Sequence, residues 1–285
     1  MSAPVLPGAN AFVVGHPIKH SRSPLIHGHW LRRYGIEGSY ERVDVPPQAI
    51  AAFLNSLAER GFRGGNVTIP HKEAAYRLAG ELTDRARRLE AVNTVWLDDG
   101  RLHGDNTDIL GYVAHLDQTL GTGWEAGIDS ALVLGAGGAA RAVVAGLLDR
   151  GVGRIVVANR TLARAEEIVA LAPPRVAAAG WADLGKHMAA ANLLVNTTSL
   201  GMAGQPPLDL NLEPMRAGAV VSDIVYVPLE TPLLADARRR HLRTVDGLGM
   251  LLHQAVPGFE RWFGVRPEVT AELRALVVAN IEGGR

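Results

Sequence analysis

The stretch SALVLGAGGAARAVVAGLLDRGVGRIVVANRT, Ser130–Thr161, decides the expected fold of this chain. Its apolar start, Ala131–Leu134, predicts a strand buried on both faces of a sheet. A glycine-rich turn follows, and after it a helix is expected to about Arg150. Two glycines, Gly151 and Gly153, end this helix, and the apolar run Arg154–Ala158 predicts a second strand. The stretch therefore predicts a βαβ unit, the building block of a doubly wound parallel sheet.

The turn itself predicts a dinucleotide site. Gly135, Gly137 and Ala140 fit the spacing G-x-G-x-x-G/A. Small residues let backbone N–H groups approach a pyrophosphate, and the start of the helix favours its negative charge. Many NAD sites place an acidic residue after the second strand, but this chain has Arg160 there, which can bind a 2′-phosphate. We therefore expect NADP. The alternative is a glycine-rich turn in an ordinary α/β domain.

The composition narrows the class of protein. A chain of 285 residues with 47% hydrophobic residues allows one large domain or two ordinary domains. Lys and Arg total 29 and Asp and Glu total 29, so we expect a small-molecule substrate, not a nucleic acid or a membrane. The chain has no cysteine, and Met1–Asn10 does not have the pattern of a signal peptide. We expect a cytoplasmic monomer or homodimer.

The first hundred residues alternate strands and helices without a phosphate-binding turn, so we expect a separate α/β domain that holds the substrate. The expected strands are Ala11–Val14, Ser39–Val45, Gly61–Ile69 and a hairpin with arms Val92–Leu97 and Arg101–Gly104. Four helices are expected here. The first is Ser23–Tyr34, and the second runs from Pro46 to about Arg60. The third follows Pro70 and ends at about Leu78, and a short fourth helix begins at Thr83 or Asp84.

Alternation continues after the glycine-rich stretch. We expect further strands at Asn192–Asn196, Ala219–Ile224 and Leu242–Val245, and helices at Gly111–Leu120, Ala163–Leu171, Trp181–Ala191, Thr231–Arg240, Met250–Phe263 and Pro267–Ile281. The expected domains are residues 1–108 for substrate, residues 109–246 for NADP in a Rossmann-type sheet, and residues 247–285 as helices that pack back on the substrate domain. The cleft between the two domains is then the expected site.

Several polar residues follow the expected strands, where open α/β sheets bind ligands. Ser21 and Ser23 precede a helix and are either ligand contacts or helix caps. Asn66 and Thr68 share one face of an extended segment. Lys72 follows them closely, which is unusual for a solvated surface lysine.

The expected hairpin brings a carboxylate close to these polar residues. Its arms bring Asn93 close to Asp108, which could pair with Lys72 or could cap the next helix. Gln254 is either a site residue or a surface residue. No metal is expected, because the spacing of the histidines before Trp30 is not that of a metal site.

Taken together and in order, these motifs resemble the NADP-dependent shikimate dehydrogenase family. The resemblance covers the chain from about Gly15 to Gln254 and rests on HPIKHSRSPLIH, GGNVTIPHKE, AVNTV, DNTD, VLGAGGAARA, NRT, NTTSLGM, DIVYVPLETPLL and DGLGMLLHQA. It implies reversible reduction of 3-dehydroshikimate to shikimate in aromatic amino acid biosynthesis, with Lys72 and Asp108 as the catalytic pair.

The resemblance also implies two sets of binding residues. The substrate set is Ser21, Ser23, Asn66, Thr68, Lys72, Asn93, Asp108, Tyr226 and Gln254. The cofactor set is Asp84, Gly135, Ala136, Gly137, Gly138, Ala139, Asn159, Arg160, Thr161, Arg164, Ile224 and Gly247.

Two positions bear on this assignment. Ile109 stands where the family commonly has glycine, so the backbone after Asp108 could differ from the family's. His71 precedes the catalytic lysine and could perturb it or be a surface residue.

Three other functions compete. A quinate/shikimate dehydrogenase of the same superfamily is the nearest, although many such enzymes use NAD, against which Arg160 argues. A methylenetetrahydrofolate dehydrogenase-like enzyme has a similar two-domain plan, but the serine pair and NTTSLGM of this chain argue against it. A non-catalytic shikimate- or quinate-sensing module would be favoured by loss of Lys72 or Asp108, and both are present.

Overall fold

The computed structural model describes residues 8–283, which form two compact units. The first comprises residues 8–108 and 252–280, and the second comprises residues 109–251 and 281–283. The chain enters the second unit at the start of helix α5 (Asp108–Leu120) and leaves it within helix α10 (Leu248–Phe263). The expectation of no signal peptide falls largely on residues 1–7, outside the described residues. No helix between residues 8 and 283 is long and apolar enough to cross a membrane.

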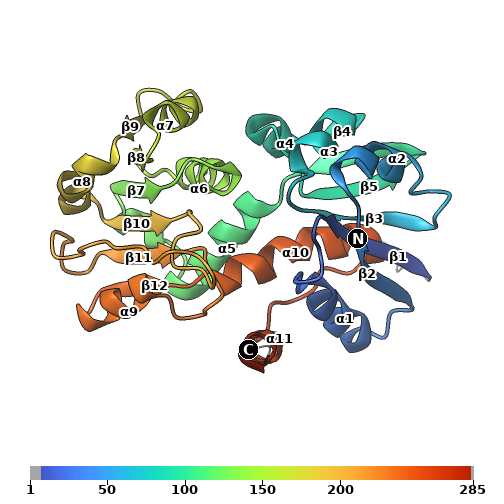
Figure 1. Cartoon of the computed structure of the whole chain (residues 1–285). Helices are drawn as coiled ribbons and strands as arrows, with labels where there is room; N and C mark the ends of the chain where they lie inside the picture. The colour runs from blue at the N-terminus through green and yellow to red at the C-terminus, as the bar shows by residue number, and fades with distance from the viewer. Residues whose placement is uncertain (1–7, 284–285) are drawn as a thin grey trace. The chain divides into compact units, whose positions relative to one another are not determined.

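The second unit contains a six-stranded parallel sheet with the order β12-β11-β10-β7-β8-β9 (Figure 1). Strand β10 follows β9 in the chain but pairs with β7, on the side opposite β8. The strand order therefore reverses at β7. This is the doubly wound order of dinucleotide-binding folds, and it confirms the expected Rossmann-type sheet. The strands are β7 (Ser130–Leu134), β8 (Arg154–Ala158), β9 (Val176–Ala179), β10 (Leu193–Asn196), β11 (Val220–Asp223) and β12 (Arg243–Val245).

Both faces of this sheet are buried because successive side chains of each strand point to opposite sides. Val133 and its aligned neighbours pack with α5, α6 (Gly138–Asp149) and α7 (Leu162–Val169) in one core. Leu134 and its neighbours pack with α8 (Leu184–Ala190) and α9 (Pro232–Arg239) in the other. The continuous apolar runs of the sequence are therefore those of a sheet covered on both sides.

Strand β9 is absent from the sequence-based expectation. Val176–Ala179 reads VAAA, and alanine is depleted in strands, so its composition gives almost no strand signal. It becomes a strand because it pairs in parallel with β8 at the sheet edge.

The first unit contains a second six-stranded sheet, with the order β2-β1-β3-β5-β6-β4. It is mixed: β5 pairs antiparallel with β3 and with β6, and the latter pair is the expected Asp-Gly hairpin. The strands are β1 (Ala9–Gly15), β2 (Gly38–Asp44), β3 (Phe62–Val67), β4 (Glu81–Leu82), β5 (Thr94–Asp98) and β6 (Arg101–Asp105).

The two faces of this sheet have different cores. Phe12 of β1 packs at ring distances of 5.0 Å against Phe53 and Phe62 on the face that also buries Ala75 of α3 (Lys72–Leu78). The other face carries aromatic rings from α1 (Ser23–Arg33) and α10, among them Trp262. The remaining helices of this unit are α2 (Ile50–Asn55), α4 (Asp84–Leu89) and α11 (Ala271–Gly283).

A glycine in β3 makes room for the second of these cores. A Cβ on Gly64 would lie 2.2 Å from the carbonyl oxygen of Val95 and 2.5 Å from the indole nitrogen of Trp262. That nitrogen donates to the Val95 carbonyl across 2.9 Å. The glycine of the GGNVT motif therefore lets a tryptophan of α10 bond directly to the sheet backbone.

Several helix boundaries differ from the sequence-based expectation; α5, for example, begins at Asp108 and not at Gly111. The helix expected to reach about Arg60 ends at Asn55 and is followed by turns. The last helix begins at Ala271, not at Pro267, because Thr270 caps it by accepting from the backbone N–H of Leu273 across 3.2 Å.

A buried histidine makes the stability of the first unit depend on pH. His27 is fully buried and stacks on Tyr40 at 3.9 Å, with the rings of Trp30 and Trp262 each 5.5 Å away. Burial lowers the pKa of His27 from its ordinary value of 6.5 to about 3. The unfolded chain therefore binds a proton as the pH falls below about 6.5 while the folded chain does not, so stability is lost on acidification.

Replacing His27 with Phe should remove this pH dependence while keeping a stacked ring. We expect the wild type to lose about 2 kcal/mol more than the variant in free energy of unfolding between about pH 7 and about pH 5. Urea unfolding followed by tryptophan fluorescence measures this. Carboxylates that titrate in this range contribute equally to both proteins and cancel, so equal pH slopes would show that His27 is not buried as a neutral ring.

Candidate active site

The centre of the site is an ion pair between the first residues of two helices. Lys72 begins α3 and Asp108 begins α5, and Lys72 Nζ donates to Asp108 Oδ2 across 2.7 Å. The Asp108 side chain is 14% exposed and the Lys72 side chain 30%, so the pair is only partly shielded from water. The structure thus brings together the two residues that the family resemblance implies as the catalytic pair.

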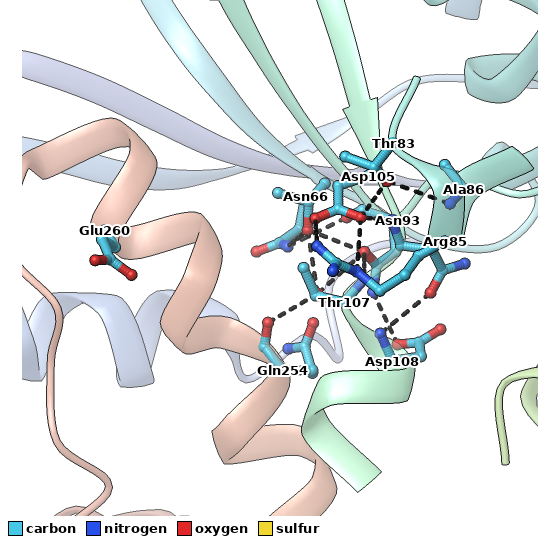
Figure 2. A network of polar contacts seen from close by, with 12 residues as sticks. Asn66, Thr83, Arg85, Ala86, Asn93, Asp105, Thr107, Asp108, Gln254 and Glu260 are labelled. Atoms are coloured by element: carbon cyan, nitrogen blue, oxygen red, sulfur yellow. Dashed lines mark hydrogen bonds and ion pairs between the residues drawn. The ribbon is translucent and has the colours of Figure 1, made fainter. Parts of the chain in front are cut away.

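Asn93 holds the other oxygen of the carboxylate. Its Nδ2 donates to Asp108 Oδ1 across 2.8 Å (Figure 2), as the hairpin argument predicted. The Asn93 Oδ1 accepts from the backbone N–H of Thr107 across 2.9 Å, which fixes which end of the amide faces the carboxylate. Because Asp108 is itself the first residue of α5, it does not precede that helix as a cap.

The loop before Asp108 is held by a buried carboxylate. Asp105 accepts from Arg85 Nη2 at 2.6 Å and Nε at 3.2 Å, from Thr83 Oγ1 at 2.6 Å, and from the backbone N–H of Asn106 at 2.7 Å. Asn106 in turn accepts from the backbone N–H of Asp108 through Oδ1, at 3.1 Å. Figure 2 shows the Arg85 side chain lying against Asp105. Arg85 is not among the predicted site residues, and Asp105 belongs to the motif DNTD but was not singled out.

The strand residues of the site lie beside this pair. Asn66 is buried in β3, and its Nδ2 donates to the carbonyl oxygen of Asn93 and to Thr94 Oγ1, both at 3.2 Å. Thr68 follows the strand, half-buried, and its backbone N–H donates to the carbonyl of Val14. Thr94 stands in the quoted motif AVNTV but was not singled out, because a threonine in a strand is ordinary.

Ser21, Ser23 and Gln254 are the other predicted substrate-binding residues of the first unit. Ser21 Oγ donates to Ser23 Oγ at 3.3 Å, and Arg42 holds the carbonyl oxygen of Ser21 at 2.6 and 2.9 Å. Arg22 occupies the cap position of α1 without a capping side chain, and Ser21 Oγ accepts from the backbone N–H of Ser23, the first residue of the helix, across 3.3 Å. Gln254 is half-buried in α10, and its carbonyl oxygen accepts from Thr107 Oγ1 at 2.8 Å.

The glycine-rich turn fits a dinucleotide. Gly135 has φ +101°, and a Cβ there would lie 2.9 Å from Thr197 Oγ1, so only glycine suits the position. Gly137 and Gly138 are exposed, with nothing within 4 Å of where a Cβ would stand. Ala136 and Ala139, the other predicted residues, are half-buried beside them. The open backbone at the start of α6 can therefore be approached by a phosphate.

The predicted 2′-phosphate residues lie at the start of α7. Arg160 and Arg164 are both exposed, and Thr161 is the residue that precedes the helix. Asn159 Nδ2 donates to the carbonyl oxygen of Thr161 across 2.8 Å and tightens this turn. Two cations next to a helix N-terminus suit a phosphate group.

The remaining predicted residues are Ile224, Tyr226, Gly247 and Asp84. Ile224 and Tyr226 follow β11 in the second unit, and Gly247 packs so closely that a Cβ would lie 2.2 Å from the carbonyl oxygen of Ile224. Asp84, predicted for the cofactor, belongs to the first unit, where it is exposed and paired with Arg87 at 3.0 Å.

Two doubtful positions are resolved by burial. Ile109 is 3% exposed inside α5 and does not have positive φ, so this backbone needs no glycine after Asp108. His71 is 1% exposed, and its Nε2 lies 2.7 Å from the carbonyl oxygen of Val45. The alternative of a surface histidine is therefore wrong.

A doubly wound sheet with this turn, together with a lysine–carboxylate pair in a second α/β unit, defines a two-domain nucleotide-dependent dehydrogenase. Within residues 8–283 no group of three or more side chains suited to a metal ion is present.

Comparison with known proteins gives the family. The shikimate dehydrogenase substrate binding domain matches residues 13–95, shikimate/quinate 5-dehydrogenase matches residues 125–202, and the shikimate 5′-dehydrogenase C-terminal domain matches residues 247–276. The chain belongs to the shikimate dehydrogenase family, and it is an oxidoreductase.

Three similar proteins illustrate this. Shikimate dehydrogenase (NADP⁺) of Methylobacterium radiotolerans is 65% identical over 96% of this chain and 98% of its own. Shikimate 5-dehydrogenase of Thermus thermophilus, solved with NADP(H) and shikimate, is 37% identical with a TM-score of 0.85 and covers 95% of this chain and 99% of its own. Quinate dehydrogenase of Corynebacterium glutamicum, solved with NAD, is 29% identical with a TM-score of 0.89 and covers 96% of this chain and 100% of its own.

The Arg85–Asp105 pair should stabilise the first unit measurably. Replacing Arg85 with Met removes two donors from a carboxylate whose side chain is 8% exposed, and we expect the free energy of unfolding to fall by about 1–3 kcal/mol. Replacing Arg87 with Met on the same helix breaks only an exposed pair and should cost less than about 0.5 kcal/mol. Urea unfolding of both variants measures this, and equal losses would contradict the assigned role of Arg85.

Proposed function

We propose that the protein catalyses the reversible NADPH-dependent reduction of 3-dehydroshikimate to shikimate. The observation that carries the proposal is the Lys72–Asp108 pair, with its ammonium 2.7 Å from a carboxylate that Asn93 also holds. Family membership and the NADP(H)- and shikimate-bound relative from Thermus thermophilus support the substrate and the cofactor.

The cofactor would be held by the glycine turn and the arginines. The Gly135–Ala139 backbone and the start of α6 suit the pyrophosphate, and Arg160 with Arg164 suits the 2′-phosphate. When bound, NADPH supplies the hydride. The residues described above fit this cofactor, because exposed glycines leave the backbone open where phosphates approach.

Lys72 would supply the proton. Reduction of a ketone places hydride on carbon and a proton on oxygen, and the Lys72 ammonium has three N–H groups, of which Asp108 takes one. In the reverse direction the neutral amine takes the hydroxyl proton. Asp108 would orient both Lys72 and the reacting hydroxyl, since each of its oxygens is already fixed by one donor.

The other predicted residues would bind the substrate. Ser21 and Ser23 would bind the carboxylate, which is supported by the clustering of their hydroxyls at the start of α1. The ring hydroxyls would be bound by Asn66, Thr68, Asn93, Tyr226 and Gln254.

Oxidation of quinate is the second candidate, because the quinate dehydrogenase has the same fold at a TM-score of 0.89. That protein was solved with NAD, whereas Arg160 favours NADP here. Purified enzyme should be assayed by cofactor reduction with shikimate and with quinate, each with NADP⁺ and with NAD⁺. We expect the shikimate–NADP⁺ pair to be fastest; activity only with quinate and NAD⁺ would overturn both the substrate and the cofactor.

We propose a cytoplasmic enzyme, supported by the absence of cysteine, and a monomer or homodimer acting on a small molecule.

Loss of the Lys72 amine should reduce turnover much more than binding. We expect Lys72→Ala to lower kcat by roughly 10²-fold or more, with a modest change in KM for shikimate, since general acid–base catalysis typically contributes that much. Lys186→Ala, at an exposed lysine of α8, is the matched control and should leave both constants unchanged. Steady-state kinetics measure this, and near-normal turnover of Lys72→Ala would exclude the assigned role.

Loss of the Arg160 guanidinium should affect only the phosphorylated cofactor. We expect Arg160→Ala to raise KM for NADP⁺ by roughly 10- to 100-fold, the range for hydrogen bonds to a charged group. The KM for NAD⁺ serves as the internal control and should stay within about twofold of the wild type. Parallel increases for both cofactors would mean that Arg160 does not contact the 2′-phosphate.

A further inference from the structure

A tyrosine that the proposed mechanism does not use is bonded to a substrate residue. Tyr40 lies in β2, two strands away from Asn66 in β3, and its hydroxyl donates to Asn66 Oδ1 across 2.6 Å. In the sheet register Tyr40 is aligned with Ala11, and Ala11 with Gly64. These two small residues let the ring extend across β1 toward Asn66.

Tyr40 is a neutral donor held in one place. Its ring stacks on His27 with an interplanar angle of 10°, and Trp262 of α10 packs at 5.9 Å. Burial holds the pKa of the Tyr40 phenol well above its usual value. His27 is also neutral, because burial lowers its pKa to about 3, and neither of its ring nitrogens has a hydrogen-bond partner of normal geometry.

The Tyr40 bond begins a chain of hydrogen bonds that all run in one direction. Tyr40 donates to the Asn66 oxygen, and the Asn66 amide donates to Thr94 Oγ1. Thr94 donates to Asn93 Oδ1 across 2.9 Å, and Asn93 Nδ2 donates to the Asp108 carboxylate. The catalytic carboxylate is the acceptor at the end of this chain.

These hydrogen bonds leave the Asn66 side chain only one way to bind a ligand. Both of its amide N–H groups are used, by the Asn93 carbonyl oxygen and by Thr94. Its oxygen has two lone pairs, and Tyr40 takes one. Asn66 can therefore only accept from a ring hydroxyl, through the lone pair that Tyr40 leaves open.

We propose that Tyr40 is a positioning residue of the substrate site, whose hydroxyl holds the Asn66 amide so that its oxygen accepts a substrate hydroxyl. The proposal rests on the proposed function, because it takes Asn66 as a substrate contact. Without the hydroxyl, Asn66 keeps its two donor bonds but loses the 2.6 Å hydrogen bond to its oxygen. The amide then holds its acceptor position less firmly.

Tyr40→Phe tests this, because it keeps the ring on His27 and removes only the hydroxyl. We expect KM for shikimate to rise about 3- to 10-fold, the effect of one hydrogen bond, with kcat and KM for NADP⁺ within about twofold of the wild type. Tyr34→Phe is the matched control. Its hydroxyl accepts from the Glu268 backbone N–H at 3.2 Å and its ring contacts Phe259 of the same aromatic cluster, so we expect no change in KM.

A double-mutant cycle separates positioning from a general loss of structure. If Tyr40 acts through Asn66, adding Tyr40→Phe to Asn66→Ala raises KM for shikimate no further. Multiplying effects would overturn the proposal, as would an unchanged KM in Tyr40→Phe alone. If Tyr40→Phe does not fold, Thr94→Val breaks the next link and should give the same split between KM and kcat, so an unchanged KM there decides against the proposal.

Different results would contradict the proposed function and the proposed role of Tyr40. A wild-type enzyme that does not oxidise shikimate with NADP⁺ contradicts the proposed function. A wild-type enzyme that does so, with Tyr40→Phe indistinguishable from it, contradicts only the role of Tyr40.

Discussion

The geometry of the site depends on one carboxylate, that of Asp108. Its two oxygens are held from two directions, by Lys72 at the start of α3 and by Asn93 at the start of the hairpin. A carboxylate that is 14% exposed needs such donors, because a buried acceptor without partners costs free energy. The same bonds that satisfy Asp108 therefore bring the lysine and the amide together. The arrangement that stabilises Asp108 is thus also the one that the proposed reaction uses.

The sheet around this pair is built so that side chains can cross it. Gly64 leaves room for Trp262 to bond to the backbone of β5, and Ala11 leaves room for the ring of Tyr40. A larger residue at either position would displace an aromatic ring from the face that carries Asn66. The small residues of β1 and β3 thus act on the site indirectly, through what they allow to pack beside it.

The sequence predicted the two sheets and the Lys72–Asp108–Asn93 cluster, because these depend on local patterns and on hairpin geometry. It did not predict β4, which is only two residues long, or β9, whose alanines form a strand only by pairing with β8. It placed the start of the last helix too early, because Pro267 is as good a start signal as the Thr270 cap. Tyr40 was not predicted for a different reason: in the sequence it looks like any inward-facing aromatic residue of a strand, and its partner lies two strands away in the sheet.

The direction of the hydrogen bonds is a further property that no residue type specifies alone. An asparagine amide can face either way, and only the whole set of partners decides which end donates. The backbone N–H of Thr107 and the carboxylate of Asp108 fix Asn93; the carbonyl oxygen of Asn93 then fixes Asn66. Once the orientation of the Asn66 amide is fixed, the residue that contacts its oxygen from the sheet side must be a hydrogen-bond donor. A phenol is such a donor, and it remains neutral when buried. The identity of residue 40 is therefore constrained by a carboxylate four hydrogen bonds away.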